Sequence, residues 1–270
     1  MSAQPVTTMV GRVVLGRYLS WLRHGRGMTP KAAVANTCVD YRALQRYETA
    51  LSAIPEPVLE ELLRRYGRGT PQGLADGLGF LKSMRPEEVT DRGYYAEERL
   101  RAVEDSATAI TVVTHWVSPP ILTGLLPYVS AVVGKGKIMP YSRPRPHCPI
   151  TLFLEDAVLR RPLRGAGAAA AQFEQWADLA AEGVITLGVF EPIEAVPPQG
   201  GLLSEITLPN ITVWVQEQDV PVYSTGLRAA WRRDLVQEAT AAALNPQDSL
   251  AAVREASRFW TARGAVAAPA

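Results

Sequence analysis

Side chains that could carry out catalysis are few in this chain. Among its three histidines, His115 stands beside Trp116 at the end of a β-branched run. An imidazole titrates near neutral pH and can accept or donate a proton. The alternative is a half-buried histidine that packs in a core. The sequence has no P-loop, no GxGxxG after a strand, no GxSxG elbow and no HExxH. His115 is therefore a catalytic candidate only under an enzymatic interpretation.

Four aromatic residues have a spacing that could line an apolar cavity: Trp116, Trp176, Trp214 and Tyr223. Ligand pockets are mostly apolar with a few polar groups, so these rings could surround a small molecule. Aromatic residues at such spacing also form ordinary cores. If the rings line a cavity, the chain is a ligand sensor. It could also be a cyclase- or isomerase-type enzyme that acts on an apolar biosynthetic intermediate.

The cysteine and histidine counts argue against metal and disulfide chemistry. Cys38 and Cys148 are the two cysteines, too few for a disulfide scaffold or a four-thiolate zinc site. We expect no metal and no cofactor. Apolar runs are interrupted before the roughly 18 residues that cross a bilayer, and the N-terminus lacks a secretory pattern. We therefore expect a cytoplasmic protein with reduced thiols and no membrane partner.

Positive charge is concentrated at the start of the chain. Residues 1–69 hold ten Lys/Arg and five Asp/Glu, a net charge of +5. The other eighteen Lys/Arg and twenty-two Asp/Glu give −4, and the whole 270-residue chain carries +1. This asymmetry suggests two modules with different partners. The positive module could bind nucleic acid, because each neutralised phosphate releases counterions. A chance excess of basic residues on the surface would give the same net charges.

The positive module is predicted to be a bundle of short helices. Thr29-Pro30 is a helix start signal, since threonine can cap and proline suits the first helical position. Asp40 can cap another helix. Together with 3–4 apolar spacing, these signals predict helices over residues 10–23, 31–36, 41–49 and 57–66. Two short helices joined by a tight turn and flanked by two more indicate a helix-turn-helix domain.

The rest of the chain is predicted to be mixed α/β. Strands are expected over residues 109–116, 150–154, 184–190, 203–208, 211–215 and 220–223. Helices are expected over residues 94–106, 166–181, 227–244 and 246–260. The fold class is therefore α+β in two modules. The expected divisions are a helix-turn-helix domain over 1–69, a linker over 70–92, a mixed α/β ligand- or partner-binding domain over 93–263 and a frayed tail over 264–270.

The first module resembles the Xre-type helix-turn-helix regulators of actinomycetes. The resemblance is carried by residues 15–19, 28–33, 44–49 and 62–67. It implies that Tyr41 lies at the start of a recognition helix. It further implies that Arg42 and Gln45 face base edges, where Arg prefers guanine and Gln prefers adenine. Arg46 and the region of Lys31 would contact phosphates or stabilise the bundle.

The chain departs from the family pattern around the turn. Thr37-Cys38 stand where the family has Leu-Gly, and a glycine there would allow a positive φ that Cys adopts only with strain. Asp40 and Ala43 replace two serines, and Ala50 replaces a glycine. Asp40 can cap the helix, but it also brings negative charge near phosphate.

The second module resembles the uncharacterised, antitoxin-like C-terminal domain that accompanies these regulators. The matching stretches are residues 154–163, 172–192 and 242–249. The resemblance implies an antitoxin-like transcriptional regulator, often encoded beside a small partner protein. Where the family has an Arg-Gln-bearing helix, this chain has a Pro-rich basic loop over residues 134–149.

Three functions follow from these patterns. The favoured one is a regulator that binds double-stranded DNA as a homodimer and senses a small molecule or a partner protein through its second module. The runner-up is a metal-free, cofactor-free enzyme that evolved from such a regulator. The third is a protein-interaction module with an exposed apolar groove. Arg42 and Gln45 standing free on a positive face would favour the first.

Overall fold

The computed structural model describes residues 10–114, 131–134, 137–140, 148–160, 165–192, 202–217 and 220–266. The chain forms two compact units. The first takes in Met1–Ser106 and Asp219–Ala230, and the second takes in Ala107–Gln218 and Trp231–Ala270. The chain therefore leaves the first unit, forms most of the second, and returns briefly to the first before its C-terminal helices.

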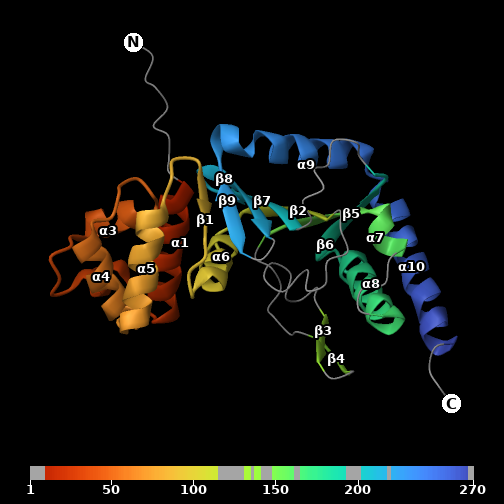
Figure 1. Ribbon diagram of the computed structural model, residues 1–270, viewed down its shortest axis with the longest axis horizontal. Coiled ribbons are helices and arrows are strands. Elements are labelled where there is room, and N and C mark those ends of the chain that lie inside the picture. The colour runs from red at the N-terminus through yellow and green to blue at the C-terminus, as the bar shows by residue number, and fades with distance from the viewer. Residues whose placement is uncertain are drawn as a thin grey trace, which may run out of the picture. The chain divides into compact units, whose positions relative to one another are not determined.

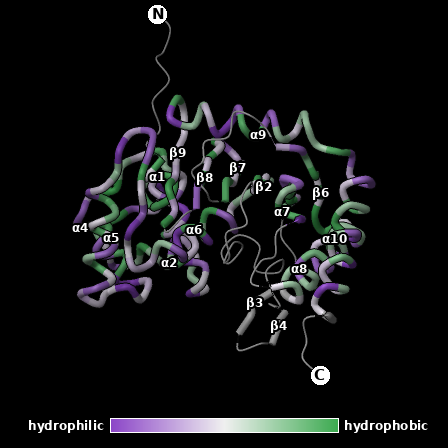
Figure 2. Tube along the Cα trace, turned by 45° about the vertical axis from the view of Figure 1, so that its right-hand side comes forward, coloured by the Kyte–Doolittle hydropathy of each residue, from purple (hydrophilic) through white to green (hydrophobic). Residues whose placement is uncertain are grey.

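Helices dominate the first unit (Figure 1). They are α1 (Val10–Gly25), α2 (Pro30–Val34), α3 (Tyr41–Glu48), α4 (Glu56–Arg65), α5 (Pro71–Ser83) and α6 (Ala96–Glu104), with a 3-10 turn η1 (Gly226–Ala229). Hydrophobic and hydrophilic residues alternate along these helices (Figure 2), the pattern of helices that bury one face. The core is apolar, and its buried members include Val14, Leu15, Leu19, Leu44, Leu59, Leu62, Leu63 and Tyr66.

A fully buried arginine ties the later elements of this unit together. Arg99 on α6 donates from Nε to Asp91 at 2.6 Å and from Nη1 to Asp76 at 2.5 Å. Its guanidinium also lies 4.7 Å from the centre of the Phe80 ring. Burial alone would lower the pKa of Arg99, but its hydrogen bonds to the two carboxylates outweigh burial and raise that pKa.

The segment predicted to link two modules, residues 70–92, contains regular structure. The Thr70 hydroxyl accepts a hydrogen bond from Gly73 N at 3.1 Å and so caps α5. Strand β1 (Glu88–Thr90) pairs antiparallel with β9 (Pro221–Ser224), with Val89 opposite Tyr223. Residues 93–106, predicted to begin the second module, lie in the first unit, where Tyr18 donates to Glu98. The predicted domain boundaries stay predictions.

A mixed sheet forms the centre of the second unit. Its strands are β2 (Ala109–Thr114), β5 (Ile150–Glu155), β6 (Ile185–Phe190), β7 (Leu202–Leu208) and β8 (Ile211–Glu217), in the order β8-β7-β2-β5-β6. β2, β5 and β6 run parallel, whereas β7 runs antiparallel to both β2 and β8. The parallel strands are almost continuously apolar and buried, as expected where both faces of a sheet are covered.

Helices cover this sheet. α9 (Ala230–Ala242) lies across the strands, and α8 (Ala166–Ala181) and α10 (Pro246–Val266) pack together beside β6 (Figure 1). The Ser257 hydroxyl on α10 donates to Ala170 O on α8 at 3.0 Å. Trp260 Nε1 donates to Leu159 O on α7 (Asp156–Arg160) at 2.8 Å. Asn245 caps α10 by accepting from Gln247 N at 3.0 Å.

The expected fold class is confirmed: an N-terminal helical region is followed by a mixed α/β region that ends in helices. One local expectation was wrong. The Pro-rich basic segment over 134–149 is not entirely loop, because β3 (Ala131–Gly134) and β4 (Lys137–Pro140) form a two-stranded antiparallel sheet. Val132, Val133 and Ile138 are β-branched, and β-branched residues favour strands.

Candidate nucleic-acid interface

Two capped helices and a short connection form the turn region. The Thr29 hydroxyl accepts from Ala32 N at 3.2 Å, and Pro30 occupies the first position of α2. The Asp40 carboxylate accepts from Ala43 N at 2.8 Å and caps α3. Asp40 is thereby the N-cap that the sequence predicted. Between the caps, the Thr37 hydroxyl donates to Val34 O at 2.8 Å and closes the end of α2.

A buried ion pair fixes the inner side of α3. Arg23 at the end of α1 donates from Nε to Glu48 Oε1 at 2.7 Å and from Nη2 to Glu48 Oε2 at 2.9 Å. Its Nη1 donates to Met28 O at 2.8 Å, in the connection that leads to α2. The hydrogen bonds to Glu48 raise the pKa of Arg23 above its ordinary value despite burial. The pair sets how α3 is rotated, since Glu48 faces inward.

Close helix packing adds to this restraint. A Cβ atom placed on Gly16 of α1 would lie 2.5 Å from Tyr47 O and 2.9 Å from Glu48 O. Only glycine permits this approach of α1 to the last turn of α3. Leu44 is completely buried in the same layer. The orientation of α3 therefore depends on a glycine, a leucine and one charged pair.

The opposite side of α3 faces solvent. Arg42, Gln45, Arg46 and Thr49 are exposed, and 38% of Tyr41 is exposed. Gln45 Nε2 donates to the Tyr41 hydroxyl at 2.8 Å, which orients the Gln45 amide. The structure thus brings Tyr41, Arg42, Gln45 and Arg46 onto one exposed helix face. We call these four residues the α3 face.

Charge on and around the α3 face is mainly positive. Within the described residues, Arg42 and Arg46 take part in no hydrogen bond or ion pair through their side chains. Lys31 on α2 is also exposed. Asp40 is the nearest acid in sequence, and its carboxylate is engaged as the helix cap. Two guanidinium groups are therefore free to meet an anionic partner.

The described residues among those predicted to line an aromatic pocket come from three different elements. His115 and Trp116 lie outside the described residues. Trp176 on α8 is 1% exposed and meets the Phe173 ring edge-on, and Trp214 on β8 is 9% exposed. Tyr223 is fully buried on β9 in the first unit. The pocket, and a catalytic role for His115, stay predictions.

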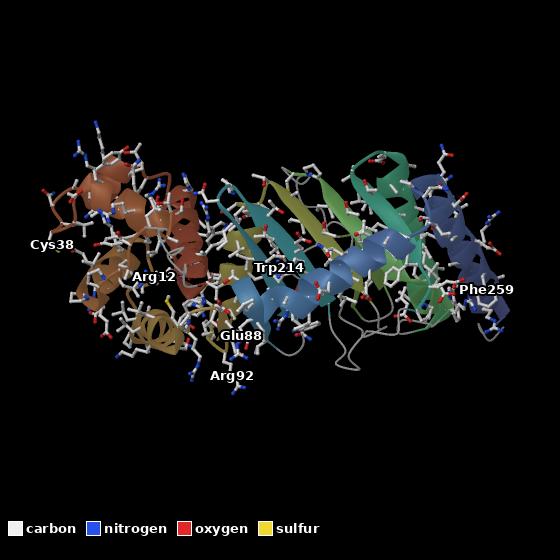
Figure 3. All side chains as sticks on the ribbon, turned by 90° about the horizontal axis from the view of Figure 1, so that it is seen from above. Arg12, Cys38, Glu88, Arg92, Trp214 and Phe259 are labelled. Atoms are coloured by element: carbon white, nitrogen blue, oxygen red, sulfur yellow. The ribbon has the colours of Figure 1, made fainter. Side chains whose placement is uncertain are left out.

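A groove that the sequence did not reveal lies at the carboxyl ends of β5 and β6. Its volume is about 750 Å³. Its walls come from the end of β6, from α7, from the residues around Leu244 and from α10. Phe259, labelled in Figure 3, is 47% exposed there, and Leu244 is 48% exposed. The signal that could have found it is the crevice rule for parallel strands, which places ligands beyond their carboxyl ends.

The rim of this groove is acidic. Asp156 is held by Arg160 at 2.6 Å, and that arginine is itself largely exposed. Glu191 and Glu255 also border the groove and are exposed. An open apolar groove with an acidic rim suits an amphiphilic molecule or peptide. We call it the β5–β6 groove.

Two family models match the chain. Residues 14–76 match a helix-turn-helix domain. Residues 128–255 match a domain of unknown function (DUF5753). No curated protein and no solved structure matches the chain. The first match includes α2, the connection and α3, whose geometry is described above.

The N-terminal helical region contains a helix-turn-helix.

This helix-turn-helix supports a DNA-binding regulator, whereas the second match names no activity. The backbone of the connection between α2 and α3 differs from the one that the family pattern led us to expect. The positive φ lies at Asn36, with φ 59°, and not at Cys38. Asparagine tolerates this left-handed conformation better than most residues do. The Cys38 thiol instead donates to Glu61 at 3.2 Å, and this hydrogen bond raises the pKa of Cys38.

Ala50 is the second unusual position of the helix-turn-helix. It has a φ of 63° just after α3, where the family pattern has glycine. Leu51 N donates to Arg46 O at 2.8 Å, so the helix ends in a left-handed cap. An alanine therefore adopts a conformation that strongly favours glycine. The substitution of alanine for glycine does not by itself indicate this backbone conformation.

Over the described part of the chain, no helix has the length and hydropathy needed to span a bilayer. The same described residues contain no cluster of three or more His, Cys, Asp or Glu side chains arranged to hold a metal ion.

Proposed function

We propose that this chain is an Xre-type transcriptional regulator in which α3 is the recognition helix. The observation that carries the proposal is the α3 face, which is exposed and positive and is fixed from behind by the Arg23–Glu48 pair. A recognition helix must present rigid side chains to base edges. Arg42 and Gln45 are suited to guanine and adenine, the bases that these side chains read bidentately.

The other exposed residues of this region serve as phosphate contacts in the proposal. Lys31 and Arg46 carry positive charge, and the hydroxyl of Tyr41 can donate to a phosphate oxygen. Such contacts position a protein on the duplex without reading sequence. They also make binding dependent on salt, because each neutralised phosphate releases counterions.

A homodimer completes the regulatory proposal. Regulators with a helix-turn-helix bind two half-sites about 34–36 Å apart, or one turn of the duplex, because their two recognition helices enter successive major grooves. We infer a pseudo-palindromic operator for this chain on the same ground. Sedimentation equilibrium with and without duplex measures the stoichiometry, and one protomer per duplex at saturation would contradict the dimer.

The experiment that tests DNA reading starts from duplexes enriched from a random pool by the full chain. Arg42→Ala should weaken binding to the enriched duplex about 5- to 150-fold and relax the preference at one base pair, because a bidentate base contact contributes about 1–3 kcal/mol. Arg92 is exposed in the same unit but lies in the connection between β1 and α6 (Figure 3). Arg92→Ala is therefore the matched control and should bind within twofold of wild type. No enrichment, or equal affinity of both variants, would contradict the proposal.

We further infer that the second unit senses a small molecule or a small partner protein. The β5–β6 groove supports this inference, because its volume of about 750 Å³ falls in the range of ligand sites. Its position beyond the carboxyl ends of parallel strands is the usual one for ligands in α/β sheets. The exposed Phe259 and Leu244 supply apolar contact area.

A fluorescent apolar probe tests this groove. N-phenyl-1-naphthylamine should bind wild type and gain fluorescence. Ala252 lines the groove on α10, whereas Ala262 is exposed on the same helix outside it. Ala252→Trp should fill the groove and weaken probe binding at least fivefold, and Ala262→Trp should leave it unchanged. Equal probe binding by both variants would show that the probe binds outside the β5–β6 groove, and the groove would no longer support a sensing role.

A further inference from the structure

A second, smaller pocket lies in the first unit, directly behind α3. Its volume is about 150 Å³. One wall is a stripe of α1 that includes Leu15, Gly16 and Leu19. Tyr47 on α3, the segment from Ser52 to Ile54 and the end of α5 form the other walls. The lining is largely apolar, and neither family match assigns it a ligand.

One cationic side chain faces this pocket. Arg12 on α1 contributes to the lining and is half-buried. Within the described residues its guanidinium forms no ion pair or side-chain hydrogen bond. The other residues that line the pocket are apolar, apart from Ser52 and Tyr47. A guanidinium that lacks a carboxylate partner at an apolar pocket is suited to bind an anionic group bidentately.

The size of the pocket limits its occupant. Cavities of about 150 Å³ with aliphatic lining hold a single benzene ring. We propose that this pocket binds a small apolar carboxylate, with its ring or branched chain among Leu15, Leu19 and Ile54 and its carboxylate on Arg12. Benzoate matches the pocket in size and carries the negative charge that pairs with Arg12. An amine of the same shape would meet the guanidinium with like charge.

The pocket is joined to the recognition helix through the backbone. Leu51 N and Ser52 N donate to Arg46 O at 2.8 and 3.2 Å, so the segment that lines the pocket also caps α3. Tyr47, between Arg46 and Glu48, contributes to the pocket wall. A ligand that fills the pocket stabilises the arrangement in which α3 is held against α1. Because this consequence rests on the proposed DNA-binding function, it has its own test.

Methyl NMR of the full chain tests the ligand site without DNA. Benzoate should shift the methyl signals of Leu15, Leu19, Ile54 and Leu81, with benzyl alcohol binding more weakly and benzylamine not binding. Arg12→Gln should weaken benzoate binding about tenfold or more, since hydrogen bonds to charged groups are the stronger ones. Arg92→Gln, which removes an exposed arginine elsewhere in the unit, should leave benzoate binding unchanged.

Benzyl alcohol binding serves as the folding control for Arg12→Gln and should stay within twofold of wild type. The proposal is overturned if benzoate leaves these methyl signals unmoved, if benzylamine binds as well as benzoate, or if Arg12→Gln binds benzoate as wild type does. If Arg12→Gln also fails to bind benzyl alcohol, the binding of benzoate and of benzyl alcohol is measured in Arg12→Met instead. This variant keeps an apolar stem of similar length. Loss of both ligands in that variant would also overturn the role of Arg12.

Duplex binding with and without benzoate tests the regulatory consequence. Saturating benzoate should raise affinity for the enriched duplex about fivefold, the lower end of typical allosteric coupling. Sodium acetate at the same ionic strength is the control for salt. If benzoate binds but does not change the affinity for the duplex, the regulatory role is contradicted and the ligand site is retained. Absence of duplex binding in every condition would contradict the proposed function instead.

Discussion

The α3 face and the β5–β6 groove are built in opposite ways. The α3 face consists of polar side chains that project from a short helix, and its orientation depends on one buried ion pair and one glycine. The groove is lined mainly by apolar side chains where two parallel strands end, and its walls come from the end of β6, α7, the residues around Leu244 and α10. The α3 face is therefore set by a few specific contacts, whereas the β5–β6 groove follows from the layout of the sheet.

Glu48→Ala should produce the largest effect, because it leaves the Arg23 charge buried without its carboxylate. Breaking a buried pair in this way costs about 3–5 kcal/mol. The free energy of unfolding, measured in urea, should fall by that amount. Glu60 forms an exposed pair with Arg64 at 2.8 Å, and Glu60→Ala should cost less than about 1 kcal/mol. Equal losses would mean that the buried pair has no special role in holding α3.

Gly16→Ala should have the next largest effect. The added Cβ would meet the backbone oxygens of Tyr47 and Glu48, so α1 and α3 must move apart. Overpacking of this kind costs about 1–3 kcal/mol. Gly25 lies on the same helix with open space around its Cβ position, so Gly25→Ala should be neutral or slightly stabilising. Thermal unfolding of both variants makes the comparison, and a stable Gly16→Ala would show that close packing does not fix α3.

Ala50→Gly should stabilise the first unit. A non-glycine residue at a φ of 63° is strained, and glycine removes that strain at some entropic cost. We expect a gain of about 0.5–1 kcal/mol in the free energy of unfolding. Ala35 has a negative φ of −60°, so Ala35→Gly should lose stability instead. A loss in both variants would indicate that the cap after α3 is not strained.

Substitution of Glu205, in the second unit, should have the smallest effect on stability. Its side chain stands on β7 opposite Thr111 and Trp214, and burial raises its pKa above the ordinary 4.5. A raised folded-state pKa means that stability present below pH 4.5 is lost as the pH rises through the raised value. Glu205→Gln should therefore raise the melting temperature more at pH 7 than at pH 4. The gain should stay under about 1 kcal/mol because the group is only partly buried.

Much of the architecture was predictable because local signals agree with it. The caps at Thr29 and Asp40, the apolar stripe of α1 and the buried strand patterns correctly indicate their elements. The exposed positions of Arg42 and Gln45 match the helix periodicity. These features depend on residues that lie close together in the sequence.

Features that depend on distant residues were not predictable in the same way. The Arg23–Glu48 and Arg99–Asp76–Asp91 contacts join separate elements, and no periodicity indicates which charges are buried. The β5–β6 groove also depends on where α10 packs after a long intervening stretch of chain. The positive φ at Asn36, in place of Cys38, depends on how the connection closes on α2.

The salt dependence of duplex binding tests the central claim most directly. Fluorescence anisotropy would give the affinity of wild type and of Arg46→Gln for the enriched duplex over a range of salt concentrations. Wild type should bind with affinity that falls steeply as salt rises, and Arg46→Gln should reduce the slope of log affinity against log salt by about 0.9, the contribution of one phosphate contact. Identical slopes, or no preference of wild type for the enriched duplex over a random one, would contradict a DNA-reading role for α3.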